Sequence, residues 1–195
     1  MTESTSPPAN ALDTWLAEEA EIRRRLESGC GHGVALAGQA VGKTGLELMQ
    51  AMLNGAFPAP PIGKLLDFLL VEISPGRAVF QGTPGPTHLN PMGGVHGGWY
   101  ATLLDSALGC AVHTMMPLGR AYTTAELGVN LVKAISPKVL RVRAIGTVIH
   151  CGRQLATAEA RLIGPDGTLY AHATTTCLVF EALDKAQTKA VRLST

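Results

Sequence analysis

The longest regular pattern of apolar residues in the chain follows a glycine-rich segment, Asn90–Gly98. No proline interrupts residues 92–116, so one helix of about five turns can run from near Gly97 to about Thr114. A broad apolar face of that helix is formed by Tyr100, Leu103, Leu104, Ala107, Leu108 and Ala111. An apolar face this broad predicts a helix that is deeply covered by other parts of the structure.

Segments with the composition of β-strands lie on both sides of this helix. Two of them flank the turn Ser74-Pro75-Gly76, which predicts a hairpin, and four more follow the break at residues 116–119. The expected strands are 65–73, 77–82, 121–132, 139–150, 154–163 and 168–180. Two strands, a helix and four strands in this order predict an α+β fold, in which an antiparallel sheet of about six strands curls around one long central helix.

The first 60 residues are expected to form an extension of this fold, partly helical and partly disordered. Residues 1–10 are polar, contain two prolines and are expected to be disordered. Residues 12–26 predict a helix with Asp13 as a candidate N-cap. The charged residues assigned to a solvated face of that helix are Glu18, Glu19, Arg23 and Arg24.

A second helix of the extension is expected over residues 44–53, where Thr44 and Glu47 have the spacing of a capping box. The proline-rich link that follows, residues 58–61, is expected to exclude regular structure and to end the extension. The main domain would then span residues 61–182, with a polar, frayed tail over 183–195. A lid, a dimer arm and a stabilising segment are all compatible with the extension.

Composition narrows the class of protein. The 195 residues fit one domain with an appendage, and a 46% hydrophobic content allows a substantial core. A net charge of +1 and a pI near 7.7 argue against a nucleic-acid-binding surface. No segment approaches the roughly 20 apolar residues of a membrane span, and no signal peptide is evident. The four cysteines lack CxxC spacing, so free thiols and a cytoplasmic localisation are the simplest interpretation.

Several common sites are disfavoured by the motifs. Gly42-Lys43-Thr44 has the ending of a P-loop, but the glycine that a P-loop needs five residues earlier is replaced by Ala37. The histidines and cysteines show no spacing typical of metal ligands, so no metal site is expected. No GxGxxG motif or βαβ alternation is present, which argues against a Rossmann domain.

The central helix carries two candidate functional groups. Asp105 lies at the edge of the apolar face, where a carboxylate is costly to bury unless it has a use. At the helix start, the backbone amide of Gly97 has no partner within the helix and could hold a developing oxyanion. These two positions are eight residues apart, or roughly 12 Å along a helix. One substrate carbonyl therefore needs Asp105 and Gly97 from two copies of the chain, related by a two-fold axis.

The motifs of this region resemble the signature of PaaI-type hotdog-fold acyl-CoA thioesterases, in the 4-hydroxybenzoyl-CoA thioesterase-like superfamily. The matching segments are Asn90, His96-Gly97-Gly98, Leu104-Asp105, Thr123–Leu127, Ser136-Pro137 and Gly152-Arg153. The resemblance covers roughly residues 66–180 and implies the hotdog fold, the same layout that the strand and helix pattern predicts.

The resemblance implies catalytic roles for five residues. Asp105 would attack the thioester carbonyl or activate a water, and the Gly97 amide of the partner subunit would hold the oxyanion. His96 and Asn90 would contact the thioester or the water, although each could instead hold the loop in shape. Thr124 would position the water or substrate, with Thr123 as the alternative.

Coenzyme A phosphates require cationic and polar partners. The resemblance assigns this role to Gly152 and Arg153, with Arg143 and Thr175 as weaker candidates. For Arg143 the alternative is a solvated strand face, and for Thr175 a place in the strand without a ligand.

The expected function is hydrolysis of an aromatic or medium-chain acyl-CoA to the free acid and coenzyme A. No cofactor is expected, because coenzyme A belongs to the substrate. A homodimer is the smallest working unit, and the family resemblance implies a tetramer; neither nucleic acid nor a membrane is an expected partner. The alternatives are a non-catalytic acyl-CoA-binding or sensor module and an enoyl-CoA hydratase on the same fold.

Overall fold

A computed structural model describes residues 11–36, 38–136 and 138–182 of the chain. The helices are α1 (Ala11–Ser28), α2 (Gly45–Leu53), α3 (Pro61–Leu65) and α4 (Gly97–Thr114), with a short 3-10 turn η1 (Pro86–His88). The strands are β1 (Phe68–Ser74), β2 (Arg77–Gly82), β3 (Arg120–Leu131), β4 (Val142–Cys151), β5 (Leu155–Ile163) and β6 (Leu169–Glu181). The disorder predicted for residues 1–10 and the frayed tail predicted for 183–195 lie outside the described residues.

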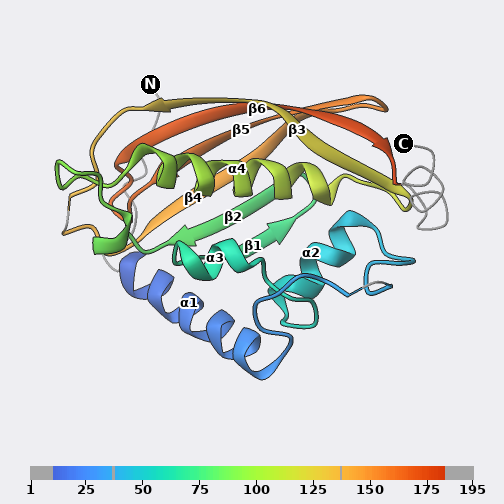
Figure 1. Cartoon of the computed structure of the whole chain (residues 1–195), viewed down its shortest axis with the longest axis horizontal. Helices are drawn as coiled ribbons and strands as arrows, with labels where there is room; N and C mark the ends of the chain where they lie inside the picture. Colours follow the sequence, from blue (N-terminus) through green and yellow to red (C-terminus); the bar gives the residue numbers. More distant parts are fainter. Residues whose placement is uncertain (1–10, 37, 137, 183–195) are drawn as a thin grey trace.

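The six strands form one antiparallel sheet in the order β1-β2-β4-β5-β6-β3. The sheet curves around α4, which lies along its concave face (Figure 1). The predicted apolar face of α4 is fully buried there, including Leu103, Leu104 and Leu108 at 0% exposure. The predicted α+β layout, with one long central helix inside a curled sheet, is confirmed.

Two strands begin three residues later than predicted, for local reasons. β1 begins at Phe68 because α3 occupies the preceding residues and the chain turns at Asp67, which has a φ of 47°. β4 begins at Val142 because a turn precedes it, in which the amide of Val139 donates to the carbonyl of Ser136. None of the helices in the described ranges is long and apolar enough to cross a membrane.

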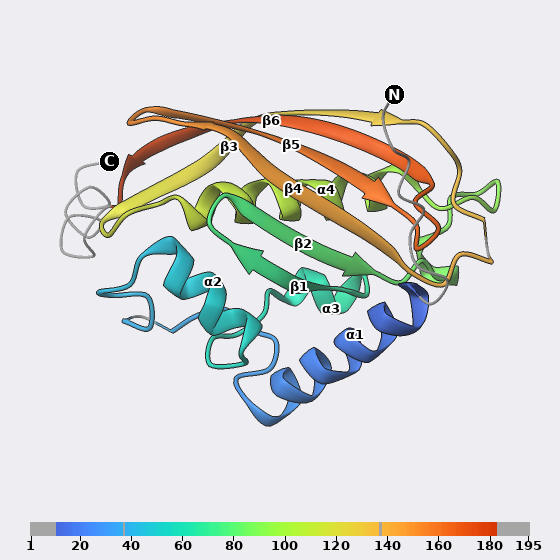
Figure 2. The same ribbon diagram turned by 180° about the vertical axis from the view of Figure 1, so that it is seen from behind.

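The helices of the N-terminal extension gather on the hairpin side of the sheet (Figures 1 and 2). The capping box predicted for α2 is present, with Thr44 as N-cap and Glu47 as its partner. The prediction that the proline-rich link excludes regular structure is wrong at its end. Pro61 is the first residue of the one-turn helix α3, a position where its fixed φ and missing amide are tolerated. The domain boundary expected near residue 60 stays a prediction.

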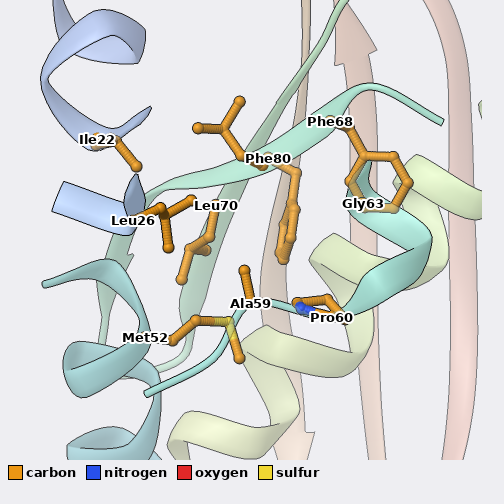
Figure 3. A pocket seen from close by; sticks show the side chains of 10 residues that line it. Ile22, Leu26, Met52, Ala59, Pro60, Gly63, Phe68, Leu70 and Phe80 are labelled. Atoms are coloured by element: carbon orange, nitrogen blue, oxygen red, sulfur yellow. The ribbon is translucent and has the colours of Figure 1, made fainter. Parts of the chain in front are cut away.

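Between the extension and the hairpin lies a closed apolar contact (Figure 3). Ile22 and Leu26 of α1 pack with Ala59 and with Leu69 of β1. The cavity left among these elements has a volume of about 10 Å³, roughly the space of one water. The extension therefore packs directly against the hairpin.

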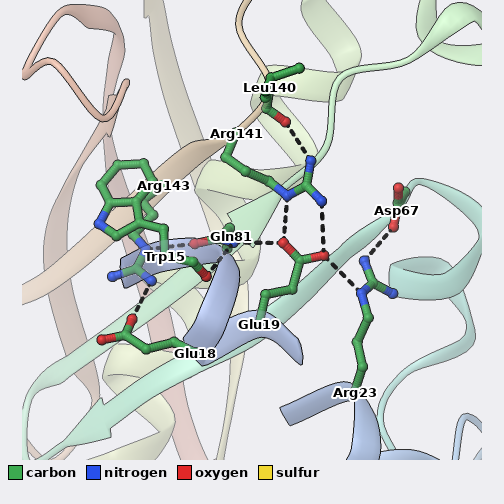
Figure 4. Close-up of polar contacts among 9 residues, drawn as sticks. All are labelled: Trp15, Glu18, Glu19, Arg23, Asp67, Gln81, Leu140, Arg141 and Arg143. Carbon is green, nitrogen blue, oxygen red and sulfur yellow. Dashed lines mark hydrogen bonds and ion pairs between the residues drawn. The ribbon is translucent and has the colours of Figure 1, made fainter. Parts of the chain in front are cut away.

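The prediction of a solvated charged face on α1 is wrong for Glu19. Its side chain is 5% exposed and accepts hydrogen bonds from Arg141, which lies just before β4, from Arg23 at 2.8 Å and from Gln81 at 2.7 Å (Figure 4). Arg23 also pairs with Asp67 at 2.7 Å. Gln81 belongs to β2 and Arg141 immediately precedes β4, and a helix pattern alone does not show that such residues pack against the polar side of α1. Asp13 is not an N-cap either, because α1 begins at Ala11 and places Asp13 in the first turn.

Replacing Glu19 with Gln is expected to lower the free energy of unfolding by about 3 kcal/mol, the lower end for a broken buried pair, because Arg141 and Arg23 keep some contact with water. For a chain of this length, the melting temperature would fall by roughly 6–12 °C. Thermal and urea unfolding measure both quantities. The matched control is Glu21→Gln, since Glu21 pairs with Arg24 and Arg25 on the exposed side of the same helix. Equal stability of both variants would contradict the role of Glu19 as a buried partner of Arg141 and Arg23.

The same carboxylate predicts an acid-sensitive stability. Burial raises the pKa of Glu19, but hydrogen bonds from Arg141, Arg23 and Gln81 outweigh it and leave the pKa below its usual value of 4.5. The unfolded chain therefore binds the proton more tightly than the folded one. The stabilisation from Glu19 is complete above pH 4.5 and is lost as the pH falls through the lower, folded-state pKa. The stability difference between wild type and Glu19→Gln should shrink in that range.

Candidate active site

The glycine-rich loop before α4 is held in shape by Asn90. Its side-chain oxygen accepts from the amide of Met92 at 2.9 Å and from the amide of Gly94 at 3.2 Å. A backbone bridge between Leu89 and Val95 closes the loop. The loop-holding contact considered for Asn90 is therefore present, and its role toward the water or the thioester stays a prediction.

His96 is the N-cap of α4. Its Nδ1 accepts from the amide of Gly98 at 2.9 Å, and the ring is exposed. Because Nδ1 is an acceptor here, a neutral His96 carries its proton on Nε2. The structure thus shows a helix-capping role, and the Nε2 edge stays open to a ligand.

The amide of Gly97 is the first of α4 and none of the described residues accepts a hydrogen bond from it. A Cβ at this position would lie 2.9 Å from Cδ1 of Leu131 on β3, the flexible end of that side chain, which would have to shift slightly. The amide also lies at the positive end of the helix dipole. These features suit an amide that binds a negatively charged oxygen.

Asp105 lies two turns further along α4 and is half-buried. The hydroxyl of Thr124 on β3 donates to its Oδ1 at 3.3 Å. Thr124 is therefore the member of the pair Thr123/Thr124 that meets the carboxylate. Within one chain, the straight course of α4 keeps this carboxylate away from the Gly97 amide by the roughly 12 Å expected for eight residues.

Three residues that the sequence did not single out surround Asp105. Tyr122 lies against Gly109 of α4, where a Cβ would come within 2.8 Å of the phenol oxygen. Burial raises the pKa of Cys110 to about 12, and the charge of Asp105 adds to the effect. Burial likewise raises the pKa of Cys177 and, well above its usual value, that of Tyr122. Gly109 lies one turn after Asp105, and a glycine at this place in the sequence could have indicated that a bulky side chain such as Tyr122 packs against the helix there.

These surroundings predict unequal thiol reactivity. Cys30 is exposed, whereas Cys177 is buried and Cys110 stays protonated at pH 8 with a pKa of about 12. Because thiolate is the reacting form, Cys30 should react first with 5,5′-dithiobis(2-nitrobenzoate), and Cys110 and Cys177 only after unfolding. Mass spectrometry of the labelled peptides would identify each site. Rapid labelling of Cys110 in the folded protein would contradict this environment.

Two of the residues proposed to bind coenzyme A are occupied within the chain. Arg143 is 9% exposed as a residue. Its guanidinium donates to Gln81 at 2.8 Å, pairs with Glu18 and lies 4.4 Å over the ring of Trp15 (Figure 4). Both the phosphate-binding role and the solvated strand face are therefore wrong for Arg143, because α1 covers it.

Thr175 is 2% exposed and its hydroxyl donates to the carbonyl of Glu126 at 2.7 Å. A buried hydroxyl with an internal acceptor cannot reach a phosphate.

The other pair, Gly152-Arg153, lies at the turn between β4 and β5. The amide of Gly152 donates to the carbonyl of Leu155 at 2.8 Å, which tightens the turn. The side chain of Arg153 is exposed, and its backbone carbonyl accepts from the guanidinium of Arg120. Arg153 thus presents a cation to solvent. In the described ranges, no three His, Cys, Asp or Glu side chains are grouped as a metal site requires.

Two open hollows flank the start of α4 and share Val95. One has a volume of about 200 Å³, with Pro84, Leu89, Val95 and Ile135 in its wall. The other has a volume of about 230 Å³ and is lined in part by Val95, Tyr100, Leu131 and Lys133. Since Leu131 also contacts Gly97, the second hollow adjoins the free amide.

Residues 92–171 match the family model described as the thioesterase superfamily. Among solved structures, a thioesterase family protein from Silicibacter pomeroyi is 26% identical with a TM-score of 0.57, over 63% of this chain and 90% of that one. A mutant of the phenylacetic acid degradation protein PaaI from Thermus thermophilus is 26% identical with a TM-score of 0.55, over 60% of this chain and 97% of that one.

A putative thioesterase from Ralstonia eutropha, described as phenylacetic acid degradation-related, is 24% identical with a TM-score of 0.61, over 67% of this chain and 98% of that one; it shows the fold alone. No curated protein matches the chain. The family match spans α4, β3, β4 and β5, and the solved structures with PaaI among them share the fold. Residues 92–171 therefore carry the likeness to the thioesterase superfamily, and the chain has the hotdog fold.

Proposed function

We propose that this protein is an acyl-CoA thioesterase that hydrolyses an acyl-CoA to the free acid and coenzyme A. The observation that carries the proposal is the half-buried Asp105 on the predominantly apolar α4, hydrogen-bonded to Thr124, in a fold whose helix start offers the free Gly97 amide. A carboxylate and an oxyanion donor are the two groups that thioester hydrolysis needs most.

In the simplest sequence of steps, the Asp105 carboxylate removes a proton from a water, and the water oxygen attacks the thioester carbonyl. The carbonyl oxygen becomes an oxyanion, which accepts a hydrogen bond from the Gly97 amide. The C–S bond then breaks, and the thiolate of coenzyme A takes up the proton held by Asp105. In the alternative, the carboxylate attacks the carbonyl carbon directly and the C–S bond breaks, which releases the thiolate of coenzyme A and leaves a mixed anhydride. Water then hydrolyses the anhydride to the free acid and restores the carboxylate, and the proton released protonates the thiolate. Thr124 orients the carboxylate in both.

The proposed site needs two chains. Since Asp105 and Gly97 of one α4 are too far apart for one carbonyl, we place Asp105 of one subunit beside Gly97 of its partner, with the two helices antiparallel. The edge of the sheet supports this arrangement. β3 is a long edge strand with exposed residues 123–126, and such an edge is normally covered or paired. The opposite edge, β1, is already packed against α2 and α3. Assembly of two dimers into a tetramer rests on the family resemblance.

The acyl group and the nucleotide take different parts of the surface in this proposal. The two apolar hollows at the start of α4 would receive the acyl group, and their volumes suit a phenyl ring or a medium-length chain. Arg153 is the exposed cation proposed for the coenzyme A phosphates. No cofactor is required, because the thioester is activated by its own coenzyme A.

The proposal is tested by thiol release from a panel of acyl-CoAs. The Thermus relative is a phenylacetic acid degradation protein, so phenylacetyl-CoA, hydroxybenzoyl-CoA and straight-chain acyl-CoAs belong in the panel. Release from at least one member, abolished in Asp105→Asn, is the expected result. Binding of acyl-CoA without thiol release would instead indicate a non-catalytic binding module. Addition of water to crotonyl-CoA without cleavage of the thioester would indicate a hydratase.

A further inference from the structure

The strand β3 is interrupted by a β-bulge next to Asp105. Its register on β6 pairs Thr124 with Cys177 and Glu126 with Thr176, which leaves Ala125 without a partner. The irregularity therefore falls one residue after the threonine that contacts the candidate carboxylate. Bulges next to active sites commonly re-aim a side chain.

The bulge changes which residues of β3 face α4. Before it, Tyr122 and Thr124 face the helix, as their contacts with Gly109 and Asp105 show. After it, the residues packed against the core are Leu127 and Val129. In a strand without the extra residue, alternation from Thr124 would point Glu126 inward instead. The bulge thus allows Tyr122 and Thr124 to face α4 near Asp105, while the part of β3 after the bulge turns the apolar side chains of Leu127 and Val129 toward the core.

The side chain of Thr175 holds this bulge from the neighbouring strand. Thr175 pairs with Leu127 in the register, and its hydroxyl donates to the carbonyl of Glu126 at 2.7 Å. The hydroxyl is 3.9 Å from the thiol of Cys177, the residue paired with Thr124. Because Thr175 is 2% exposed, water cannot substitute for this hydrogen bond.

We propose that Thr175 is a positioning residue for catalysis, which fixes the bulge at Glu126 and thereby aims the Thr124 hydroxyl at Asp105. The inference rests on the proposed thioesterase function for its kinetic consequence, but the bulge and its hydrogen bond are independent of that function. Thr175 touches no substrate atom. It acts through the backbone of β3, and its loss displaces Thr124.

Thr175→Val removes the hydroxyl with little change of shape. We expect kcat to fall on the order of 10- to 100-fold, as for a small displacement of a catalytic group, with KM changed by no more than about twofold. Thr175→Ser keeps the hydroxyl and should restore kcat. Thr174→Val is the matched control, because Thr174 is exposed on the opposite face of the same strand. Equal loss in Thr175→Ser, or a loss confined to KM, would overturn the proposal.

A double-mutant cycle separates this role from a general structural one. If Thr175 acts through Thr124, Thr124→Ala with Thr175→Val should lose no more kcat than the worse single variant, whereas additive losses would overturn the proposal. A crystal structure of Thr175→Val gives a readout that needs no activity. We expect the Thr124–Asp105 distance to exceed the 3.3 Å of the wild type. An unchanged bulge and distance would refute the positioning role, while an inactive wild type would refute the proposed function alone.

Discussion

Asp105→Asn is expected to lower kcat on the order of 10²- to 10⁴-fold, the usual contribution of a positioned base. Asparagine has nearly the same shape and its carbonyl oxygen can still accept the hydrogen bond from Thr124. It can neither take a proton from water nor attack a thioester. The expected loss is therefore chemical, and KM should change little.

The control for Asp105→Asn is Ser106→Ala at the next position of α4. The Ser106 hydroxyl donates to the carbonyl of Thr102 within the same helix, so its loss perturbs α4 without touching the carboxylate. Steady-state kinetics with the best acyl-CoA of the panel, with melting temperatures for both variants, would measure the effect. Full activity of a folded Asp105→Asn would contradict the assignment of Asp105.

Gly97→Pro is expected to lower kcat on the order of 10²- to 10³-fold, the cost of losing one oxyanion donor. Proline has no amide hydrogen, and the first position of a helix is where proline is best tolerated. The preceding residue, His96, already has a φ of −64° and a ψ of 135°, a conformation that a following proline favours. The substitution thus removes the donor with little expected change in the helix.

Gly97→Ala is the matched control for Gly97→Pro. It introduces the same Cβ, which would lie 2.9 Å from the flexible end of Leu131, but it keeps the amide hydrogen. We expect the alanine variant to retain most of the activity and the proline variant to lose it. Equal losses in the two variants would mean that space beside Leu131, and not the amide, matters at this position.

The elements of the fold were largely predictable from the sequence because they depend on local signals. The uninterrupted apolar face from Tyr100 to Ala111 predicted α4, and the capping residues Thr44 and Glu47 predicted the start of α2. The α1 network was not predictable, since Glu19 pairs with Arg141, which is 122 positions away. A charged side chain on a helix looks solvated until the surface that covers it is known.

The candidate site was predictable only in part. The motifs predicted Asp105 and the free Gly97 amide, and their expected separation on one helix follows directly from α4. The interpretation of Thr175 as a phosphate ligand was wrong, because three consecutive threonines do not show which of them faces inward. The contact between Thr124 and Asp105 depends on the bulge in β3, which has no recognisable sequence signal here.

The proposed active site combines Asp105 of one subunit with Gly97 of its partner. A heterodimer of an Asp105→Asn chain and a Gly97→Pro chain tests it most directly, after co-expression with two affinity tags and purification on both. If the site is shared, one of its two sites is intact, and about half of the wild-type activity per dimer should return although each homodimer is inactive. Activity no higher than that of the homodimers would contradict the shared site.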